Sequence, residues 1–395
     1  MLANRDIICI SDLSWDAHWS TEQQFMSRLC KSNRVLYVNQ PITWLTPMKG
    51  LFSTRAVTSK KPSNLKNPER RYDRLYVASL PPLLPFRYSR LANVWNTGQY
   101  VRHIKRWARE LDLRSPILWI YEPSAYNIPK FIDHSFVIYH CLDCWTGHDD
   151  WWNSDNNIAR CEKQLVIQSD LVITVSESLY HDKARLNPNT HFVPNGADYS
   201  HFSKSLLPDT QIPKEMQEIN HPIIGFIGMI GTRFDAATLQ KVAKARPDWS
   251  IVLIGEAIKK ERSLALLVQL PNVHFLGMQP IEKLPSYLKA MDVCLIPYKK
   301  NSFTDNCFPL KFFEYLSAGK PIVASSIPSL NKYPRYVYLS NNTEEYLNNI
   351  ELALTKNSAA TVRDRVALAE GNSWDARLRE IGNIIDITKG LARRN

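Results

Sequence analysis

Short apolar runs alternate with longer segments of helical periodicity along almost the whole sequence. The runs are rich in Val and Ile and are apolar on both faces, which is typical of parallel strands buried between two layers of helices. The pattern restarts after a polar, proline-containing stretch at 203–221, so it predicts an α/β chain with two doubly wound sheets. The strands we expect are 7–10, 35–38, 75–78, 117–121, 136–140, 171–175, 191–193, 223–227, 251–254, 273–276, 293–297, 321–324 and 336–339.

This restart also sets the expected domain boundaries in the 395-residue chain. We expect a Rossmann-like N-terminal domain over 1–202, a linker over 203–221 and a second Rossmann-like domain over 222–372. Residues 373–395 are predicted to form a helix that packs back on the N-terminal domain. Ligands of open parallel sheets bind outside the carboxyl ends of the strands, so we expect a cleft between the two sets of strand ends.

Positive charge is concentrated in the first third of the chain. Residues 1–120 carry 19 Lys and Arg against 8 Asp and Glu, while the rest of the chain carries 30 of each. The first third therefore accounts for the net charge of +11 and predicts an anionic partner: nucleic acid, a membrane surface or a phosphorylated substrate. Most of these basic residues lie outside the predicted helices and form no nucleic-acid-binding motif, which argues against nucleic acid.

Residues 41–100 fit the strand and helix pattern least well. They interleave aromatic and proline-rich patches with Arg and Lys. Such a segment can lie on a membrane surface or hold the phosphate of an acceptor. A solvated basic loop with a few buried apolar anchors is the alternative.

The cysteines and the lengths of the apolar runs indicate where in the cell the protein is expected to lie. The seven cysteines are scattered, and the first apolar run ends at Asp12, which is too short for a secretory signal. No window approaches the 18 apolar residues of a membrane-spanning helix. We expect reduced thiols and a cytoplasmic protein that is peripheral on the inner face of the cell membrane.

The most informative segment for function is 305–325, which is predicted to run from a loop through a helix and a tight turn into a strand. Pro309 suits the first turn of that helix, so the positive end of the helix dipole would lie beside 306–310 and favour a diphosphate. Lys311 adds a cation, and Glu314 follows on the same helix face, where a carboxylate can accept both hydroxyls of a ribose. A plain surface Lys–Glu pair is the alternative.

Segment 305–325 resembles the C-terminal signature of group 1 (family 4) glycosyltransferases. Residues 225–235, 193–202 and 272–298 are similar to the first strand and loop of the donor domain, the end of the acceptor domain and the nucleobase-binding turn. Residues 18–41 resemble the opening of a subgroup that makes exopolysaccharides and teichuronic acid. The chain also resembles the xanthan glucuronosyltransferase. The resemblance implies the GT-B fold, with two Rossmann-like domains facing across a cleft, and transfer of a sugar from a nucleoside diphosphate.

The same resemblance implies a donor site in the second domain. Two glycines would let the backbone approach the diphosphate, an arginine and a lysine would neutralise it, and a glutamate would hold the ribose. A methionine and a glutamine would meet the base, with a tyrosine beside it. These donor-binding residues are Gly228, Gly231, Arg233, Met278, Gln279, Tyr298, Asn306, Leu310, Lys311 and Glu314. For the two glycines, an ordinary strand-to-helix turn is the alternative.

The sequence departs from the family pattern at two positions. Asn306 stands where the family carries the first of two glutamates, the one that faces the hydroxyls of the sugar. Thr238 stands where a lysine usually follows the arginine. Lys311 is therefore expected to carry more of the neutralisation of the diphosphate, and the stereochemical outcome of the reaction stays open.

In the N-terminal half, an apolar strand runs into a polar loop that begins near His140. Asp143 resembles, by position, the aspartate that acts as base in the xanthan enzyme, and His140 and His148 are the runners-up. Two alternatives remain: Asp143 caps the following helix, or Cys141 and Cys144 join the two histidines in a zinc or redox site. We expect no metal, because GT-B enzymes stabilise the leaving diphosphate with helix dipoles and cations.

Together these observations predict a glycosyltransferase in bacterial surface or exopolysaccharide biosynthesis. Its donor would be a nucleotide sugar, with a UDP-sugar favoured, and its acceptor lipid-linked or saccharide. No further cofactor is expected. The alternatives are an epimerase or hydrolase of nucleotide sugars on the same fold, and an inactive donor-binding subunit of an assembly complex.

Overall fold

The computed structural model describes residues 2–17, 19–45, 67–145, 155–257 and 262–392. The chain divides into two compact units. Unit 1 comprises Met1–Pro194 and Leu378–Asn395, and unit 2 comprises Asn195–Arg377.

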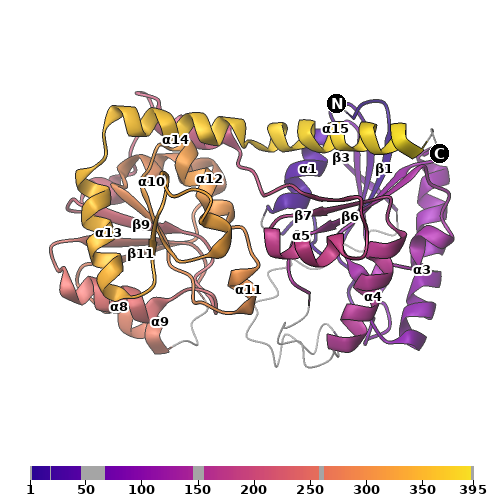
Figure 1. Cartoon of the computed structure of the whole chain (residues 1–395), viewed down its shortest axis with the longest axis horizontal. Helices are drawn as coiled ribbons and strands as arrows, with labels where there is room; N and C mark the ends of the chain where they lie inside the picture. The colour runs from indigo at the N-terminus through magenta and orange to yellow at the C-terminus, as the bar shows by residue number, and fades with distance from the viewer. Residues whose placement is uncertain (1, 18, 46–66, 146–154, 258–261, 393–395) are drawn as a thin grey trace. The chain divides into compact units, whose positions relative to one another are not determined.

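Unit 1 is built on a sheet whose strand order is β3-β4-β2-β1-β5-β6-β7-β8. All neighbouring strands pair in parallel except β3, which pairs with β4 antiparallel at one edge. Helices cover the sheet (Figure 1), and the apolar residues of α3, α4 and α5 share one hydrophobic core with the strands. The elements are β1 (Asp6–Ile10), α1 (Thr21–Leu29), β2 (Arg34–Val38), β3 (Glu69–Tyr72), β4 (Leu75–Ala78), α3 (Arg90–Glu110), β5 (Ile117–Ile120), β6 (Phe136–Cys141), α4 (Asp155–Gln168), β7 (Leu171–Thr174), α5 (Glu177–Ala184) and β8 (Thr190–Phe192).

Unit 2 is built on a parallel sheet of order β11-β10-β9-β12-β13-β14. One hydrophobic core joins the strands to α10 and α12, and a second joins them to α8 and α13, because alternate strand residues face opposite layers. The elements are α6 (Tyr199–Phe202), α7 (Lys214–Gln217), β9 (Ile223–Ile227), α8 (Ala236–Ala245), β10 (Ser250–Ile254), α9 (Arg262–Leu267), β11 (Val273–Gly277), α10 (Leu284–Ala290), β12 (Val293–Ile296), α11 (Ser302–Asp305), α12 (Leu310–Ser317), β13 (Ile322–Ser325), β14 (Tyr338–Ser340), α13 (Thr343–Thr355) and α14 (Ala359–Gly371); α15 (Trp374–Ala392) follows.

Every strand that the sequence predicts is present, with its start within a residue or two of the expected position. The two doubly wound sheets are therefore confirmed. Strand β3 was not predicted, because Glu69–Tyr72 is a charged edge strand without an apolar run. Residues 203–221 were expected as a linker, but they lie within unit 2, where Met216 and Ile219 are buried in the core.

Two helix starts show how local signals act. At α1, the backbone N–H of Ser20 donates to the side chain of Gln23 over 3.0 Å, which is one of the two hydrogen bonds of a capping box. At α12, Pro309 occupies the N-cap position, so the helix begins one residue later than a first-turn proline would place it.

A tyrosine hydroxyl fixes α12 to the end of strand β9. The hydroxyl of Tyr315 accepts a hydrogen bond from the backbone N–H of Ile227 over 2.9 Å and donates to the carbonyl oxygen of the same residue over 3.3 Å. Tyr315 is fully buried, and Ile227 is the last residue of the strand. The helix is thereby held at the carboxyl edge of the sheet.

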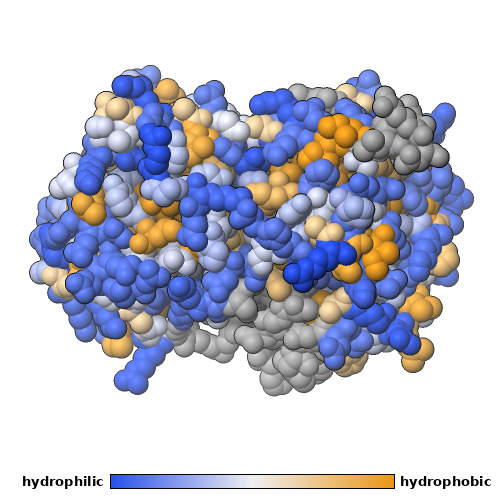
Figure 2. Space-filling model, in the orientation of Figure 1, coloured by the Kyte–Doolittle hydropathy of each residue, from blue (hydrophilic) through white to orange (hydrophobic). Residues whose placement is uncertain are grey.

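Among the described residues, no helix is both long and apolar enough to span a bilayer. On the face seen in Figure 2, apolar side chains form separate small groups among hydrophilic ones.

We predict that Tyr315→Phe lowers the free energy of unfolding of unit 2 by about 1–3 kcal/mol, because the buried N–H of Ile227 loses its partner. Tyr336→Phe is the matched control, since Tyr336 is only partly buried and its hydroxyl makes no hydrogen bond with the backbone of the described residues. The free energy of unfolding of each variant is measured by denaturant titration, with hydrogen exchange at the amides of unit 2 as the readout. Equal stability of the two variants would contradict the role given to the hydroxyl.

Candidate functional site

Glycines end three neighbouring strands of unit 2. The backbone N–H of Gly228, after β9, donates to Ile254 over 2.9 Å, and the N–H of Gly255, after β10, donates to Gly277 over 2.8 Å. Gly255 has φ +145°, and a Cβ there would lie 1.8 Å from the carbonyl oxygen of Gly228. Only glycine therefore fits at Gly255. This edge of the sheet presents bare backbone to any ligand that approaches it.

Lys311 lies against Gly228. A Cβ at Gly228 would come within 3.3 Å of Cε of Lys311, so the lysine stem covers the end of β9. Its Nζ is 2.9 Å from Oε2 of Glu314, and the two side chains are 21% and 17% exposed. The structure thus brings together one of the predicted glycines, the predicted cation and the predicted ribose ligand, beside the first turn of α12.

The loop that follows β9 is fastened to the strand end of β12. The N–H of Lys299 donates to the carbonyl oxygen of Arg233 over 2.8 Å, and Phe234 forms an isolated antiparallel bridge with Tyr298. Burial raises the pKa of Tyr298, Glu314 raises it further, and the Arg233 guanidinium acts in the opposite direction. Arg233, Tyr298 and Glu314 therefore share one electrostatic neighbourhood.

The remaining predicted donor residues occupy neighbouring loops of unit 2. Gly231 is buried in the same loop and its carbonyl oxygen accepts from Phe234. Asn306 and Leu310 are partly buried beside the start of α12. Met278 and Gln279 follow β11, on the other side of β10 from Gly228; Met278 is 74% exposed, and Gln279 is held by a 2.8 Å bond from its amide nitrogen to Leu276.

Thr238, at the position where the family carries a lysine, has a structural partner. Asp235 caps α8 by accepting from the backbone N–H of Thr238 over 3.0 Å, and the threonine hydroxyl donates to the same carboxylate over 2.6 Å. The position therefore contributes to a helix cap and supplies no positive charge.

In unit 1, His140 lies in an aromatic environment near the end of β6. Its ring stacks on Tyr121 with centroids 5.1 Å apart, and Phe25 lies at 5.5 Å on helix α1. Nδ1 accepts from the indole N–H of Trp119 over 3.4 Å. Burial lowers the pKa of His140 to about 3, so the imidazole is neutral at pH 7 and a weak proton acceptor.

Asp143 is partly buried in the loop after β6, where its carbonyl oxygen accepts from the Cys141 thiol over 3.4 Å. The next described helix, α4, begins only at Asp155, so Asp143 does not directly precede it. The other runner-up, His148, lies outside the described residues. Within the described part of the chain, no three His, Cys, Asp or Glu residues are close enough to hold a metal ion.

A buried acid pair at the end of β1 was not predicted from the sequence. Glu22 is fully buried, and burial together with the adjacent Asp12 raises its pKa well above the usual range. Hydrogen bonds from the backbone N–H of Glu22 and from the Ser20 side chain lower this pKa, but burial and Asp12 outweigh them. A protonated Glu22 is the state that this environment favours. In the sequence, Glu22 looks like an ordinary acidic residue in the first turn of a helix, so the pattern gave no signal of burial.

Comparison with known proteins adds independent findings. Residues 221–355 match the family of glycosyl transferases group 1. A Bacillus subtilis protein named for a glycosyltransferase role in teichuronic acid biosynthesis, TuaH, is 28% identical over 289 residues, which are 69% of this chain and 72% of the relative. The family match lies within unit 2, so this unit carries a group 1 glycosyltransferase domain.

Solved structures of low sequence identity share the fold of this chain. Sucrose-phosphate synthase from Thermosynechococcus elongatus superposes with a TM-score of 0.69 at 16% identity, covering 98% of this chain and 100% of that one. HepE from Anabaena, solved with UDP and glucose, superposes with a TM-score of 0.66 at 14% identity, covering 96% and 99%. The fold is GT-B.

The acid pair gives a pH-dependent prediction. Because its pKa is raised, Glu22 keeps a proton in the folded protein at pH values above about 4.3, where the unfolded chain has released it, so rising pH destabilises the folded state by up to about 1.4 kcal/mol per pH unit. Glu22→Gln removes this proton equilibrium. We therefore expect the free energy of unfolding of the variant to increase relative to that of wild type as the pH rises from 5 to about 7.

Glu110→Gln is the control, because Glu110 is exposed at the end of α3. Unfolding free energies of the three proteins across the pH range provide the measurement. If the curves of wild type and Glu22→Gln run parallel, Glu22 does not have a raised pKa.

Proposed function

We propose that the chain transfers a sugar from a nucleoside-diphosphate sugar, with a UDP-sugar favoured, to a lipid-linked or saccharide acceptor in polysaccharide biosynthesis. The placement of Lys311 and Glu314 beside Gly228 at the start of α12 carries the proposal. The TuaH relative is named for the synthesis of a cell-surface polymer, and HepE was solved with UDP and with UDP-glucose. Both findings support this substrate class.

The diphosphate is assigned to the start of α12. The first N–H groups of a helix have no partner within it, and the helix dipole adds partial positive charge there. Lys311 supplies a full positive charge over the bare end of β9, and Arg233 supplies a second from the adjoining loop. As the bond from the sugar to the diphosphate breaks, negative charge grows on the leaving oxygen, and these groups stabilise it.

The nucleoside is assigned to Glu314 and to the loop after β11. Glu314 is ion-paired to Lys311 and faces the same glycine edge, where its carboxylate can accept from two ribose hydroxyls. Met278 offers an exposed apolar surface for one face of the base, and Gln279 is already oriented by its bond to Leu276. In this proposal Tyr298 packs near the base. Gly231 and Leu310 lie beside the diphosphate, where the backbone comes close to it.

Asn306 takes the place of the family's first glutamate. An amide can donate and accept hydrogen bonds to sugar hydroxyls, whereas a carboxylate can only accept. We therefore assign Asn306 to the donor sugar, with a preference for sugars that present an acceptor to the amide N–H.

The acceptor is assigned to unit 1, with Asp143 as the base. In the reaction the acceptor oxygen bonds to the anomeric carbon, its proton passes to the Asp143 carboxylate, and the nucleoside diphosphate departs with the electron pair of the broken bond. Asp143 suits this better than His140, because the imidazole is buried and its pKa is lowered to about 3. The excess of basic residues in 1–120 suits an acceptor or membrane surface that is anionic, with the chain peripheral on the membrane.

We predict that Lys311→Ala and Glu314→Gln each weaken binding of UDP on the order of tenfold, because each removes a charge-assisted hydrogen bond. Lys241→Ala, on the exposed side of α8, is the control and should bind UDP like wild type. Calorimetry with the three variants measures the effect. Unchanged UDP affinity in both site variants would remove α12 from the donor site.

We predict that Asp143→Asn leaves UDP affinity intact and lowers kcat by roughly 10²–10⁴-fold, the contribution expected of a general base. Asp133→Asn is the matched control, because Asp133 is exposed before the opposite end of β6. Turnover of UDP-sugar with a saccharide acceptor measures the effect. A kcat near that of wild type would refute the assignment of Asp143 as base. A rise in acceptor KM that exceeds the loss in kcat would mean that Asp143 orients the acceptor.

A further inference from the structure

Arginines gather at the amino-terminal edge of the unit 1 sheet. One precedes or opens each of the strands β4, β2, β1 and β5, which are consecutive neighbours in the sheet. Asp6 is level with Arg34 in the register of β1 and β2, and Val35 is level with Leu75 in the register of β2 and β4. The side chains therefore form a row across the sheet edge: Arg74, Arg34, Arg5 and Arg114.

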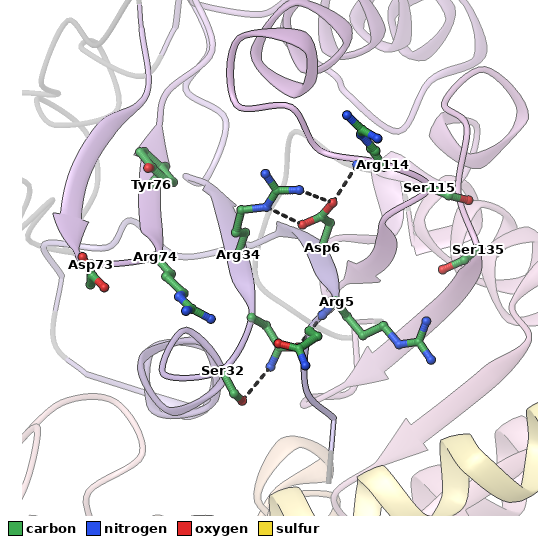
Figure 3. A pocket seen from close by; sticks show the side chains of 12 residues that line it. Arg5, Asp6, Ser32, Arg34, Asp73, Arg74, Tyr76, Arg114, Ser115 and Ser135 are labelled. Atoms are coloured by element: carbon green, nitrogen blue, oxygen red, sulfur yellow. Dashed lines mark hydrogen bonds and ion pairs between the residues drawn. The ribbon is translucent and has the colours of Figure 1, made fainter.

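These arginines line a hollow of about 620 Å³ (Figure 3). The volume lies within the roughly 300–1,000 Å³ of typical small-molecule sites. Hydroxyl groups that can donate hydrogen bonds also line it, from Tyr76, Ser115 and Ser135. Figure 3 shows Arg34 beside Asp6 in the middle of the hollow, with Arg74 and Arg5 on either side.

The acidic residues of the hollow are already engaged. The guanidinium of Arg34 donates to both carboxylate oxygens of Asp6 over 2.7 and 2.8 Å, and the backbone N–H of Arg114 donates to Asp6 over 2.7 Å. Asp73 is ion-paired to Arg70, which is not part of the lining. The negative charge in the hollow is therefore neutralised by fixed partners.

Arg34 is also held in place by backbone. Its guanidinium donates to the carbonyl oxygens of Leu111 over 3.3 Å and Asp112 over 2.7 Å. Hydrogen bonds from all three guanidinium nitrogens fix the orientation of Arg34 within the hollow.

Two guanidinium groups remain uncompensated. Arg5 and Arg74 are exposed, and among the described residues neither side chain has an acidic partner. Both flank the neutralised Arg34–Asp6 pair, so the hollow has a net positive charge. Planar guanidinium groups bind the oxygens of a phosphate in pairs, and hydroxyl donors complete the shell of such an anion.

We propose that this hollow is a binding site for a phosphate group, at the edge of the sheet opposite to the one that carries Asp143. Its ligand is a phosphate ester, either the headgroup of an anionic lipid or a soluble phosphate compound. The site accounts for part of the positive charge concentrated in residues 1–120. It is separate from the donor site of unit 2, so it does not depend on the proposed function.

The test uses the full chain and two double variants of equal charge. Arg5→Gln/Arg74→Gln changes the hollow, and Arg90→Gln/Arg102→Gln removes the same charge from exposed positions of α3. Within the described ranges of the chain, neither Arg5 nor Arg74 makes a side-chain hydrogen bond, so we expect both variants to unfold at the same temperature as wild type. Binding of inorganic phosphate is measured by calorimetry at saturating UDP, which removes competition from the donor site.

We expect the hollow variant to lose about tenfold or more in phosphate affinity, and the α3 variant to match wild type. No phosphate binding by wild type, or equal losses in both variants, would overturn the proposal. If UDP itself does not bind, the proposed function fails, while the comparison of the two variants still decides this site.

A second arm identifies the source of the phosphate. Flotation with phosphatidylcholine vesicles that contain phosphatidylglycerol is compared with flotation on pure phosphatidylcholine. If only the hollow variant loses binding to the anionic vesicles, the ligand is a lipid headgroup. If the hollow variant loses phosphate affinity but keeps vesicle binding, the ligand is a soluble phosphate compound.

Discussion

The structure of unit 2 depends on how α12 is held against the sheet. The hydroxyl of Tyr315 bonds to both backbone groups of Ile227, so the helix cannot slide along the end of β9 without breaking two buried hydrogen bonds. Lys311 and Glu314 lie on the preceding part of the same helix, and their distance from Gly228 follows from this attachment. A cation and a carboxylate are thereby held beside the end of β9 before any ligand arrives, and such preorganisation would lower the cost of binding the diphosphate that we propose there.

The two edges of the unit 1 sheet are chemically different. The carboxyl edge buries ionisable groups in neutral form: His140 has its pKa lowered by burial, and Glu22 has its pKa raised. The amino edge exposes guanidinium groups that stay charged at every physiological pH. The carboxyl edge therefore carries buried groups that are neutral, while the amino edge suits the binding of a permanent anion.

The sequence predicted the sheets well, because buried parallel strands correspond to uninterrupted apolar runs bounded by turn residues. It missed β3, whose pairing comes from its position beside β4 and not from its own residues. Gly228 and the Lys311–Glu314 pair were predictable from helix spacing and from the family resemblance, whereas the contribution of Gly255 and Gly277 to the same edge was not. The attachment by Tyr315, the acid pair of Glu22 and the row of arginines were not, because each joins residues from separate strands and helices. Such contacts appear only once the topology is known.

The most direct test of the account is hydrogen exchange on the full chain with and without UDP. We expect UDP to slow exchange at the amides of 228–235 and 306–312, since the glycine edge and the start of α12 would donate to the diphosphate. Strand β14 (Tyr338–Ser340), at the far edge of the same sheet, should exchange equally in both states. UDP binding that protects other segments and leaves both of these unchanged would contradict the placement of the donor.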